Sequence, residues 1–204
     1  MKKVLVPGDE VPGSASNADG VYSENGKHYA STILLESNGR VVPLKGYYVP
    51  IRGDYVIGIV TEERFSGYTI DLNSPYEGQI SSRDLREELQ IGDVVSAKVV
   101  SVNEVNEPVL TEVRLFSGGE LLEVDAVKIP RVIGKNGSML QLLKEYTGAD
   151  VFVGKNGRIY LRNGNLALAS LAIMKISREA HSSGLTDRMM EFLTQELRNN
   201  GDKK

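Results

Sequence analysis

One stretch of the sequence decides the fold of the C-terminal part of the chain: Val127-Lys128-Ile129-Pro130-Arg131-Val132-Ile133-Gly134-Lys135-Asn136-Gly137-Ser138. An apolar segment runs into a glycine-flanked loop, and residues 135–147 after it carry Met139, Leu142, Leu143 and Tyr146 at helical spacing. Glycines beside a helix start let backbone N–H groups approach a phosphate at the positive end of the helix dipole. Arg131 and Lys135 add positive charge, so the stretch favours a phosphate-binding loop over a plain connection between two packed helices.

The same four residues, Gly-Lys-Asn-Gly, occur again at 154–157. This copy lies between two β-prone segments, residues 149–153 and 158–161, where Asn-Gly is typical of a hairpin turn. We therefore expect a structural role for the second copy, with docking on a neighbouring domain as a further possibility.

The surrounding pattern predicts an α/β domain over residues 122–204. A strand is expected at 124–128 and long helices at 165–181 and 185–199, with Ser183-Gly184 interrupting them. The resulting order is β-α-α-β-β-α.

Upstream, residues 53–117 are dominated by short strands. The β-prone segments are residues 54–61, 67–72, 77–80, 94–102 and 109–115. A single helical patch, residues 82–89, separates the third strand from the fourth. Five strands with a helical turn at this place predict a small closed barrel of the OB type.

Residues 1–52 are rich in Gly, Pro, Asn and Ser. Asn25-Gly26 and Asn38-Gly39 lie between short β-like runs, one of them residues 28–35, and predict two hairpins. Such a small β-domain buries little apolar surface by itself, so we expect it to pack against another domain or another protein.

Composition excludes several classes of protein. With 41% hydrophobic and 25% charged residues the chain is an ordinary globular protein, and no apolar run approaches the roughly 20 residues of a membrane span. The absence of cysteine excludes disulfides and zinc sites with cysteine ligands, and the presence of only two histidines argues against a histidine metal cluster. We expect a soluble cytoplasmic protein without metal, cofactor or membrane partner.

Charge is segregated along the chain. Residues 1–126 hold 11 Lys or Arg against 20 Asp or Glu, whereas residues 127–162 hold seven basic residues against two acidic ones. A basic block in an acidic chain is either a solvated face or a footprint for a phosphate polymer.

Here a family resemblance becomes specific. The stretch 127–138 resembles the core of a KH domain. The barrel resembles an S1 domain, on Gly53-Asp54, Gly58-Ile59-Val60, Phe65-Ser66-Gly67-Tyr68, Glu77-Gly78 and Gly92-Asp93-Val94-Val95. A β-domain followed by S1 and KH domains resembles the S1–KH RNA-binding cap subunit of the archaeal exosome over nearly the whole chain. The other type of archaeal cap subunit carries a cysteine-bearing ribbon instead of a KH domain, and this chain has no cysteine. Gly154-Lys155-Asn156-Gly157 also matches an extra G-x-N-G element of the S1–KH family.

The resemblance implies a non-catalytic protein. Three copies would sit on a hexameric ring of RNase PH-like subunits, through the N-terminal domain. They would gather single-stranded RNA and lead its 3′ end into the pore, where the ring degrades it from 3′ to 5′.

The resemblance also implies RNA-binding residues. In the KH domain they are Arg131, Gly134, Lys135, Asn136 and Gly137; in the S1 domain they are the aromatics Phe65 and Tyr68, with Lys98, Arg64 and Arg83 as phosphate contacts. Either aromatic could instead belong to the barrel core. S1 domains usually have a histidine near the position that Ser81 occupies here. In the loop before the last strand they usually have an Asp and an Arg, where this chain has Asn103 and acidic neighbours. These departures weaken the S1 groove and suit a barrel that forms a pore wall.

Two other classes stay open. An enzyme would need a catalytic constellation, but Asp54, Asp71 and Asp93 are scattered and His28 and His181 lack a nucleophile partner that the sequence can place. A transcription or translation factor can also combine S1 and KH modules, although such factors usually carry two KH units. A nuclease assay on the purified chain would separate an enzyme from a binding subunit. Co-purification with ring subunits, or with ribosome or polymerase, would separate the cap subunit from a transcription or translation factor.

Overall fold

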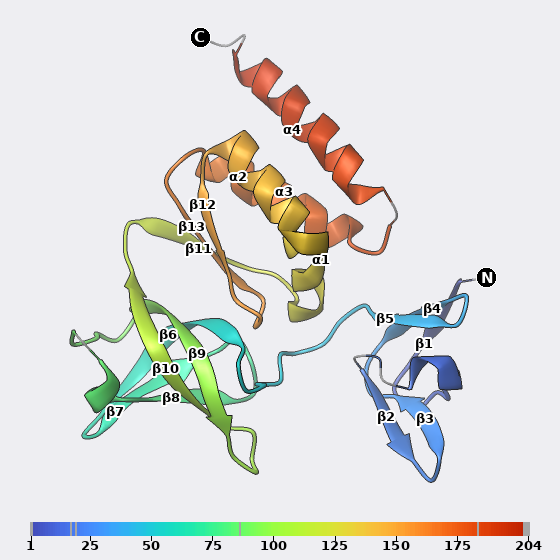
Figure 1. Cartoon of the computed structure of the whole chain (residues 1–204), viewed down its shortest axis with the longest axis horizontal. Helices are drawn as coiled ribbons and strands as arrows, with labels where there is room; N and C mark the ends of the chain where they lie inside the picture. The colour runs from blue at the N-terminus through green and yellow to red at the C-terminus, as the bar shows by residue number, and fades with distance from the viewer. Residues whose placement is uncertain (1, 17, 19, 86, 183, 202–204) are drawn as a thin grey trace. The chain divides into compact units, whose positions relative to one another are not determined.

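The computed structural model describes residues 2–16, 18, 20–85, 87–182 and 184–201. The chain divides into two compact units, residues 1–46 and residues 47–204 (Figure 1). The first unit ends before the predicted boundary at residue 52, because Tyr48 already packs in the core of the second unit.

Two hairpins build the first unit. Strands β2 (Val21–Glu24) and β3 (Lys27–Ala30) pair antiparallel, as do β4 (Leu34–Ser37) and β5 (Arg40–Pro43). The four residues of the two Asn-Gly turns have φ values of 50° to 78°, as a type I′ turn requires. Both predicted hairpins are confirmed, whereas the predicted run 28–35 is divided between β3 and β4.

A third strand completes the larger sheet of this unit. Strand β1 (Lys2–Leu5) pairs with β4, which gives the order β1-β4-β5. One turn of 3-10 helix, η1 (Gly13–Ala15), follows. The small core is aliphatic and consists of Leu5, Val11, Ala15, Ala30, Leu34 and Val41.

The second unit begins with a closed five-stranded barrel, as predicted. Its strands, in the spatial order β10-β8-β7-β6-β9, are β6 (Tyr55–Arg64), β7 (Gly67–Asp71), β8 (Glu77–Ser81), β9 (Val94–Val102) and β10 (Pro108–Phe116). A short parallel pairing of β10 with β8 closes the barrel, while the other neighbours are antiparallel.

The segment before the barrel is attached to it by side chains. The Tyr48 hydroxyl donates to an Asp54 carboxylate oxygen at 2.9 Å, and the Ser74 hydroxyl donates to the Tyr48 carbonyl at 2.7 Å. Burial and this hydrogen bond raise the pKa of Tyr48 well above its ordinary value. The residues around Tyr48 therefore belong to the barrel.

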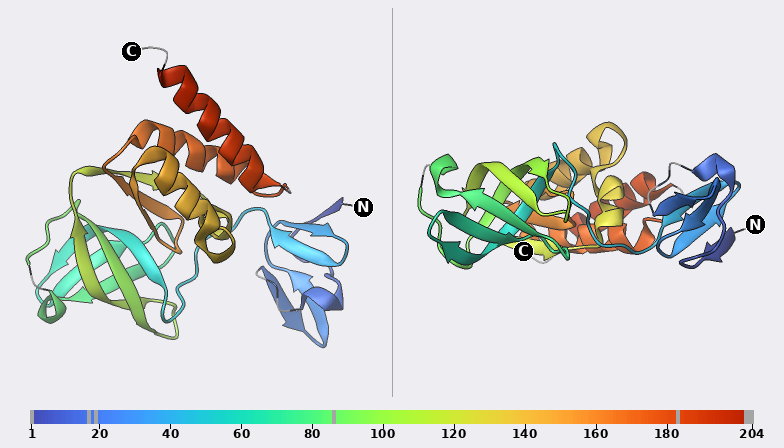
Figure 2. Two further views of the ribbon diagram at one scale, coloured as in Figure 1. Left: turned by 45° about the horizontal axis from the view of Figure 1, so that its top comes forward. Right: turned by 90° about the horizontal axis from the view of Figure 1, so that it is seen from below.

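A three-stranded antiparallel sheet with helices on one face follows the barrel. Its strands, in the order β11-β13-β12, are β11 (Gly119–Glu123), β12 (Asp150–Val153) and β13 (Arg158–Arg162). The helices are α1 (Ile129–Ile133), α2 (Ser138–Thr147), α3 (Leu166–Glu179) and α4 (Leu185–Gly201). In Figure 2 the gold and orange helices lie against one side of this sheet. Their common core includes Val132, Leu143, Ile159, Ile173 and Met189.

Two expected elements differ from the sequence interpretation. Residues 124–128 are not a strand: β11 ends at Glu123, opposite Arg158, where its partner β13 begins, and the chain then turns into the 3-10 helix η3 (Ala126–Lys128). The predicted helical patch 82–89 reduces to the 3-10 helix η2 (Ser82–Asp84), and its Arg86 lies outside the described residues. The 3-10 helix ends at Leu85, whose backbone is extended, and Leu89 is buried in the barrel core.

Candidate nucleic-acid interface

The first Gly-Lys-Asn-Gly loop joins α1 to α2 in a tight, irregular turn. The Gly134 amide donates to the Pro130 carbonyl at 3.0 Å and ends α1. The Gly137 amide donates to the Gly134 carbonyl at 3.2 Å. Asn136 and Gly137 both lie in the left-handed region, with φ of 52° and 79°. The loop thereby joins the two helices and starts α2 with no side-chain cap on its first amides.

The two glycines of this loop are required for different reasons. A Cβ atom on Gly134 would lie 2.6 Å from the Met139 amide nitrogen, so Gly134 allows α1 and α2 to approach closely. A Cβ atom on Gly137 would meet nothing within 4 Å, and only its positive φ favours glycine there. Gly134 is therefore a packing residue, and Gly137 is the glycine that faces open space.

Positive charge gathers around this loop. Arg131, Lys135 and Asn136 are exposed. Neither Arg131 nor Lys135 forms an ion pair with any residue that the structure describes. Two unpaired cations beside the positive end of the ten-residue helix α2 make a favourable environment for a phosphate group.

The second Gly-Lys-Asn-Gly loop is buried against the barrel. Asn156 is fully buried, with its side-chain oxygen accepting from the Ile57 amide at 3.1 Å. Its side-chain nitrogen donates to the carbonyls of Ile57 and Leu72 at 2.7 and 2.8 Å. The Lys155 amide adds a bond of 2.9 Å to the Tyr55 carbonyl. The hairpin interpretation holds, and the loop also docks on the barrel.

Arg158 strengthens this contact between the strand hairpin and the barrel, which we call the seam. The sequence did not predict this role of Arg158. Only 3% exposed, it donates to both the carbonyl and the carboxylate of Asp71, at 2.6 and 2.5 Å, and to the Glu123 carboxylate at 2.9 Å. One member of the basic block is thus buried and paired with carboxylates of the protein itself. The aromatic rings of Phe116 and Tyr160 stack across the seam, 4.3 Å apart.

The two S1 aromatics lie in opposite environments. Tyr68 is 7% exposed in the barrel core, where its hydroxyl accepts from the Leu89 amide at 3.4 Å, so it has no ring face for a base. Phe65 projects fully into solvent from the turn between β6 and β7. One of the two aromatics therefore belongs to the barrel core, which is the alternative left open by the sequence, and that residue is Tyr68.

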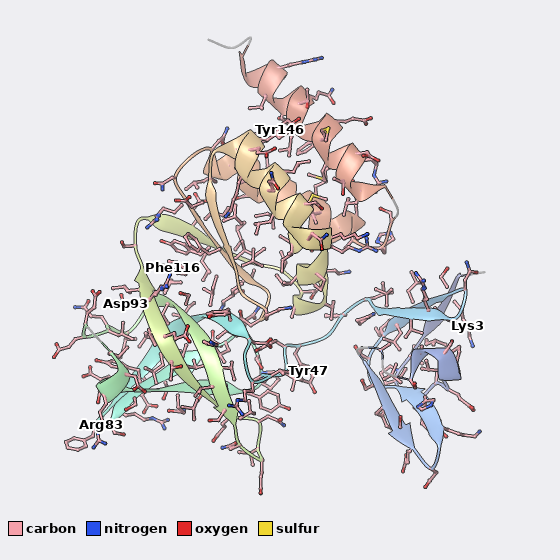
Figure 3. The ribbon with its side chains drawn as sticks, in the orientation of Figure 1. Lys3, Tyr47, Arg83, Asp93, Phe116 and Tyr146 are labelled. Carbon is pink, nitrogen blue, oxygen red and sulfur yellow. The ribbon has the colours of Figure 1, made fainter. Side chains whose placement is uncertain are left out.

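Arg64 and Arg83 lie at the same end of the barrel as Phe65. The Ser66 carbonyl accepts from both the amide and the hydroxyl of Ser82, at 3.0 and 3.2 Å, which joins the β6–β7 turn to η2. Figure 3 shows Arg83 at the end of the barrel that lies away from the α/β domain. Arg83 is exposed, while Arg64 pairs with Glu62 at 2.8 Å. This end carries the exposed ring of Phe65, with Arg64 and Arg83 at the same end of the barrel.

Lys98 does not join this group. It pairs in register with Tyr55, at the opposite end of β6 from Arg64, about 30 Å away at the usual rise of a strand. Its ammonium group lies 2.9 Å from the Glu112 carboxylate and over the Tyr55 ring. The hydrogen bond with Glu112 raises the pKa of Lys98, and the same contact lowers the pKa of Glu112. The positive charge of Lys98 is thus already paired with Glu112, beside the seam between the barrel and the hairpin.

Among the residues that the structure describes, no group of three or more His, Cys, Asp or Glu side chains is arranged to hold a metal ion. Within the same ranges, none of the helices combines the length and apolar character that a membrane span needs.

Comparison with known proteins identifies the family. The family "Exosome complex component RRP40, S1 domain" matches residues 48–118, and the KH domain family matches residues 119–165. The exosome complex component Rrp4 of Thermococcus kodakarensis is 37% identical over 231 residues, covering 97% of this chain and 90% of that protein. The chain belongs to the Rrp4 family of exosome components.

Further relatives agree with this assignment. The Rrp4 protein of Ignisphaera aggregans is 40% identical over 230 residues, covering 96% of this chain and 91% of its own length. A crystal structure described as an exosome complex RNA-binding protein superposes with a TM-score of 0.69 at 36% identity, covering 76% of this chain and 99% of that one. The predicted combination of N-terminal hairpins, S1 barrel and KH domain is confirmed.

The Rrp4 assignment also decides between the open classes. S1 and KH domains are binding domains, so the expectation of a non-catalytic chain is confirmed. The match to Rrp4 proteins extends through nearly the whole chain and not only through the S1 and KH domains. This favours an exosome component over a transcription or translation factor.

Proposed function

We propose that the chain is a non-catalytic, RNA-binding cap subunit of an exosome. Its KH loop binds the phosphates of single-stranded RNA through Arg131, Lys135 and the backbone of residues 134–137. The observation that carries this proposal is the pair of exposed, unpaired cations at the uncapped start of α2. Phosphate groups are favoured at such a helix start.

The S1 barrel supplies a second contact. Phe65 offers a ring on which a base can stack without sequence preference, and Arg64 and Arg83 lie beside it for the phosphates. Asn156 and Arg158 fix the barrel relative to the KH domain, so the two contacts are held at a constant separation. One strand of RNA can then bind at both contacts without a conformational change of the protein.

The partner of this subunit is a hexameric ring of RNase PH-like proteins, in the cytoplasm, with three caps on one ring. Residues 1–46 dock on the ring, and the cap leads the 3′ end of the RNA into the pore for degradation from 3′ to 5′. Support comes from membership of the Rrp4 family and from the first unit being a compact unit of its own.

Reconstitution tests the proposal. Ring subunits and cap are purified separately, and the cap is expected to co-elute with the ring on size exclusion and to raise the rate at which the ring shortens a 3′ single-stranded RNA. The cap alone is expected to leave the RNA intact. A chain lacking residues 1–46 should retain RNA binding but fail to co-elute. A cap that never joins the ring, or that degrades RNA by itself, would refute the assignment.

A further inference from the structure

The outward face of the β1-β4-β5 sheet is unexpectedly apolar. One face of this sheet is buried in the core of the first unit through Leu5, Leu34 and Val41. Because side chains alternate along a strand, the intervening residues point to the other face. There Val4, Leu35 and Val42 pair across the three strands in one row.

A second apolar row continues the first. Val6 and Ile33 follow and precede strands β1 and β4 with the same parity as Val4 and Leu35. The Leu44 amide donates to the Ile33 carbonyl at 2.9 Å, so the pairing of β4 with β5 extends by one residue. Val4, Val6, Ile33 and Val42 are 54%, 51%, 39% and 45% exposed, and Leu35 and Leu44 are half-buried. We call these six residues the outer aliphatic face.

This face departs from the usual pattern of a two-sided antiparallel sheet. Such a sheet normally presents polar residues on the side that meets water. Contiguous apolar patches on the surface of a folded domain, unlike single exposed apolar residues, are associated with interaction sites. The strand positions on this face carry no Asp or Glu, and the neighbouring row ends in the exposed Arg40.

Size and charge restrict what can cover the face. Six side chains on three strands about 4.8 Å apart, in two rows about 6.6 Å apart, cover about 200 Å². A stable two-protein interface needs about 800 Å² from each partner, so this patch alone is too small to hold a dimer of the chain. It suits the apolar centre of a contact with a large partner that binds the chain at other points as well. The lack of carboxylates at these strand positions and the presence of Arg40 favour a partner surface with an acidic edge.

We propose that the outer aliphatic face is the surface through which the first unit docks on the ring, against an apolar strip of a ring subunit edged by acidic side chains. This inference rests on the proposed function, which assigns ring docking to residues 1–46. It adds which side of the unit makes the contact: the sheet face, and not the β2–β3 hairpin, whose Tyr22 is also partly exposed.

Thiol labelling tests the surface directly, because the chain has no cysteine of its own. Val42→Cys introduces one thiol into the outer aliphatic face, and Glu24→Cys introduces one at the exposed end of the hairpin. Each full-length variant is labelled with a maleimide, alone and after assembly with the ring. Both should react quickly in the free chain. Assembly should slow labelling of the Val42→Cys variant by about tenfold or more, because the centre of an interface is fully buried, and should leave labelling of the Glu24→Cys variant nearly unchanged.

A second pair of variants gives an independent readout. Val4→Lys with Val42→Lys should abolish co-elution with the ring while melting temperature and RNA affinity stay close to wild type. Tyr22→Lys should leave co-elution intact.

Three outcomes would count against these assignments. If docking needs residues 1–46 but the Val42→Cys thiol stays reactive in the complex, the sheet face is the wrong surface and the proposed function stands. Protection of this thiol in the free chain would show that the chain itself covers the face and would also overturn the inference. If removing residues 1–46 leaves docking unchanged, the proposed function fails instead.

Discussion

The side-chain nitrogen of Asn156 donates a hydrogen bond of 2.8 Å to the main-chain carbonyl of Leu72, a residue that precedes it by 84 positions. The same nitrogen also donates to the Ile57 carbonyl, so one amide group in the KH hairpin bonds strand β6 and the residue that follows strand β7. Asn136 holds the corresponding position in an identical Gly-Lys-Asn-Gly sequence and is exposed. Identical sequences thus lie in two different environments, one buried at the domain seam and one in the exposed loop that we propose binds RNA.

This difference predicts that the same substitution has a large effect on stability at one position and a small effect at the other. Asn156→Gly removes three buried hydrogen bonds and should lower the free energy of unfolding by on the order of 3 kcal/mol, since each unsatisfied buried group costs about 1–3 kcal/mol. Asn136→Gly relieves a positive φ and should change stability by less than about 1 kcal/mol. Urea unfolding of both variants measures the comparison. Equal losses of stability would mean that Asn156 does not hold the seam.

The open position of Gly137 allows charge to be tested without a steric clash. Gly137→Asp should weaken binding of a single-stranded RNA by about fivefold, from roughly 1 kcal/mol of repulsion between unit charges about 4 Å apart in water. Gly137→Asn has nearly the same shape without the charge and is the matched control, because Asn and Asp both tolerate the left-handed region.

Fluorescence anisotropy and melting temperature of this pair are measured together. Gly134→Asp is not suitable for this purpose, because its side chain would press on the start of α2. An equal affinity of the Asp and Asn variants would indicate that no phosphate approaches Gly137.

The two S1 aromatics should separate binding from stability. Phe65→Ala is expected to leave the melting temperature unchanged and to cost about 1–3 kcal/mol of RNA binding, the usual value of one stacked base. Tyr68→Ala empties part of the barrel core and should destabilise the protein by about 3–5 kcal/mol, the cost of truncating a large buried aromatic. Thermal unfolding and anisotropy measure both. If Phe65→Ala binds RNA as wild type does, the exposed ring is not a stacking site.

Local signals in the sequence predicted most of the architecture. Each Asn-Gly pair demanded positive φ at two residues and so located a hairpin, and alternating β-branched residues located the five barrel strands. The exceptions have a common cause, which is pairing with a distant segment. Residues 124–128 look like a strand, but β13 begins at Arg158. The Val124 amide still donates to the Gly157 carbonyl at 2.8 Å, and the chain then turns into η3. Strand β11, with Gly119 at its start, has a weaker local pattern and forms because β13 lies beside it.

The candidate site was predictable only in part, for the same reason. The loop 134–137 and its cations follow from contiguous sequence, and the structure keeps them together. Tyr68 lies in the barrel core together with Leu89, which comes from another segment of the chain and whose amide donates to the Tyr68 hydroxyl. The burial of Arg158 depends on Asp71, 87 positions away. No local pattern reports on either partner.

The central claim is that the cations of the KH loop bind RNA phosphates, and the salt dependence of RNA affinity tests it most directly. The affinity for a single-stranded oligonucleotide is measured by anisotropy over a salt series, for wild type, for Arg131→Ala with Lys135→Ala, and for Lys144→Ala, which removes an exposed cation from the far end of α2. Each lost phosphate contact should reduce the slope of log affinity against log salt by about 0.7, so the double variant should lose about 1.4 and the Lys144 variant almost nothing. A slope in the double variant equal to that of wild type would contradict the account, because Arg131 and Lys135 would then be no more than solvated surface charges.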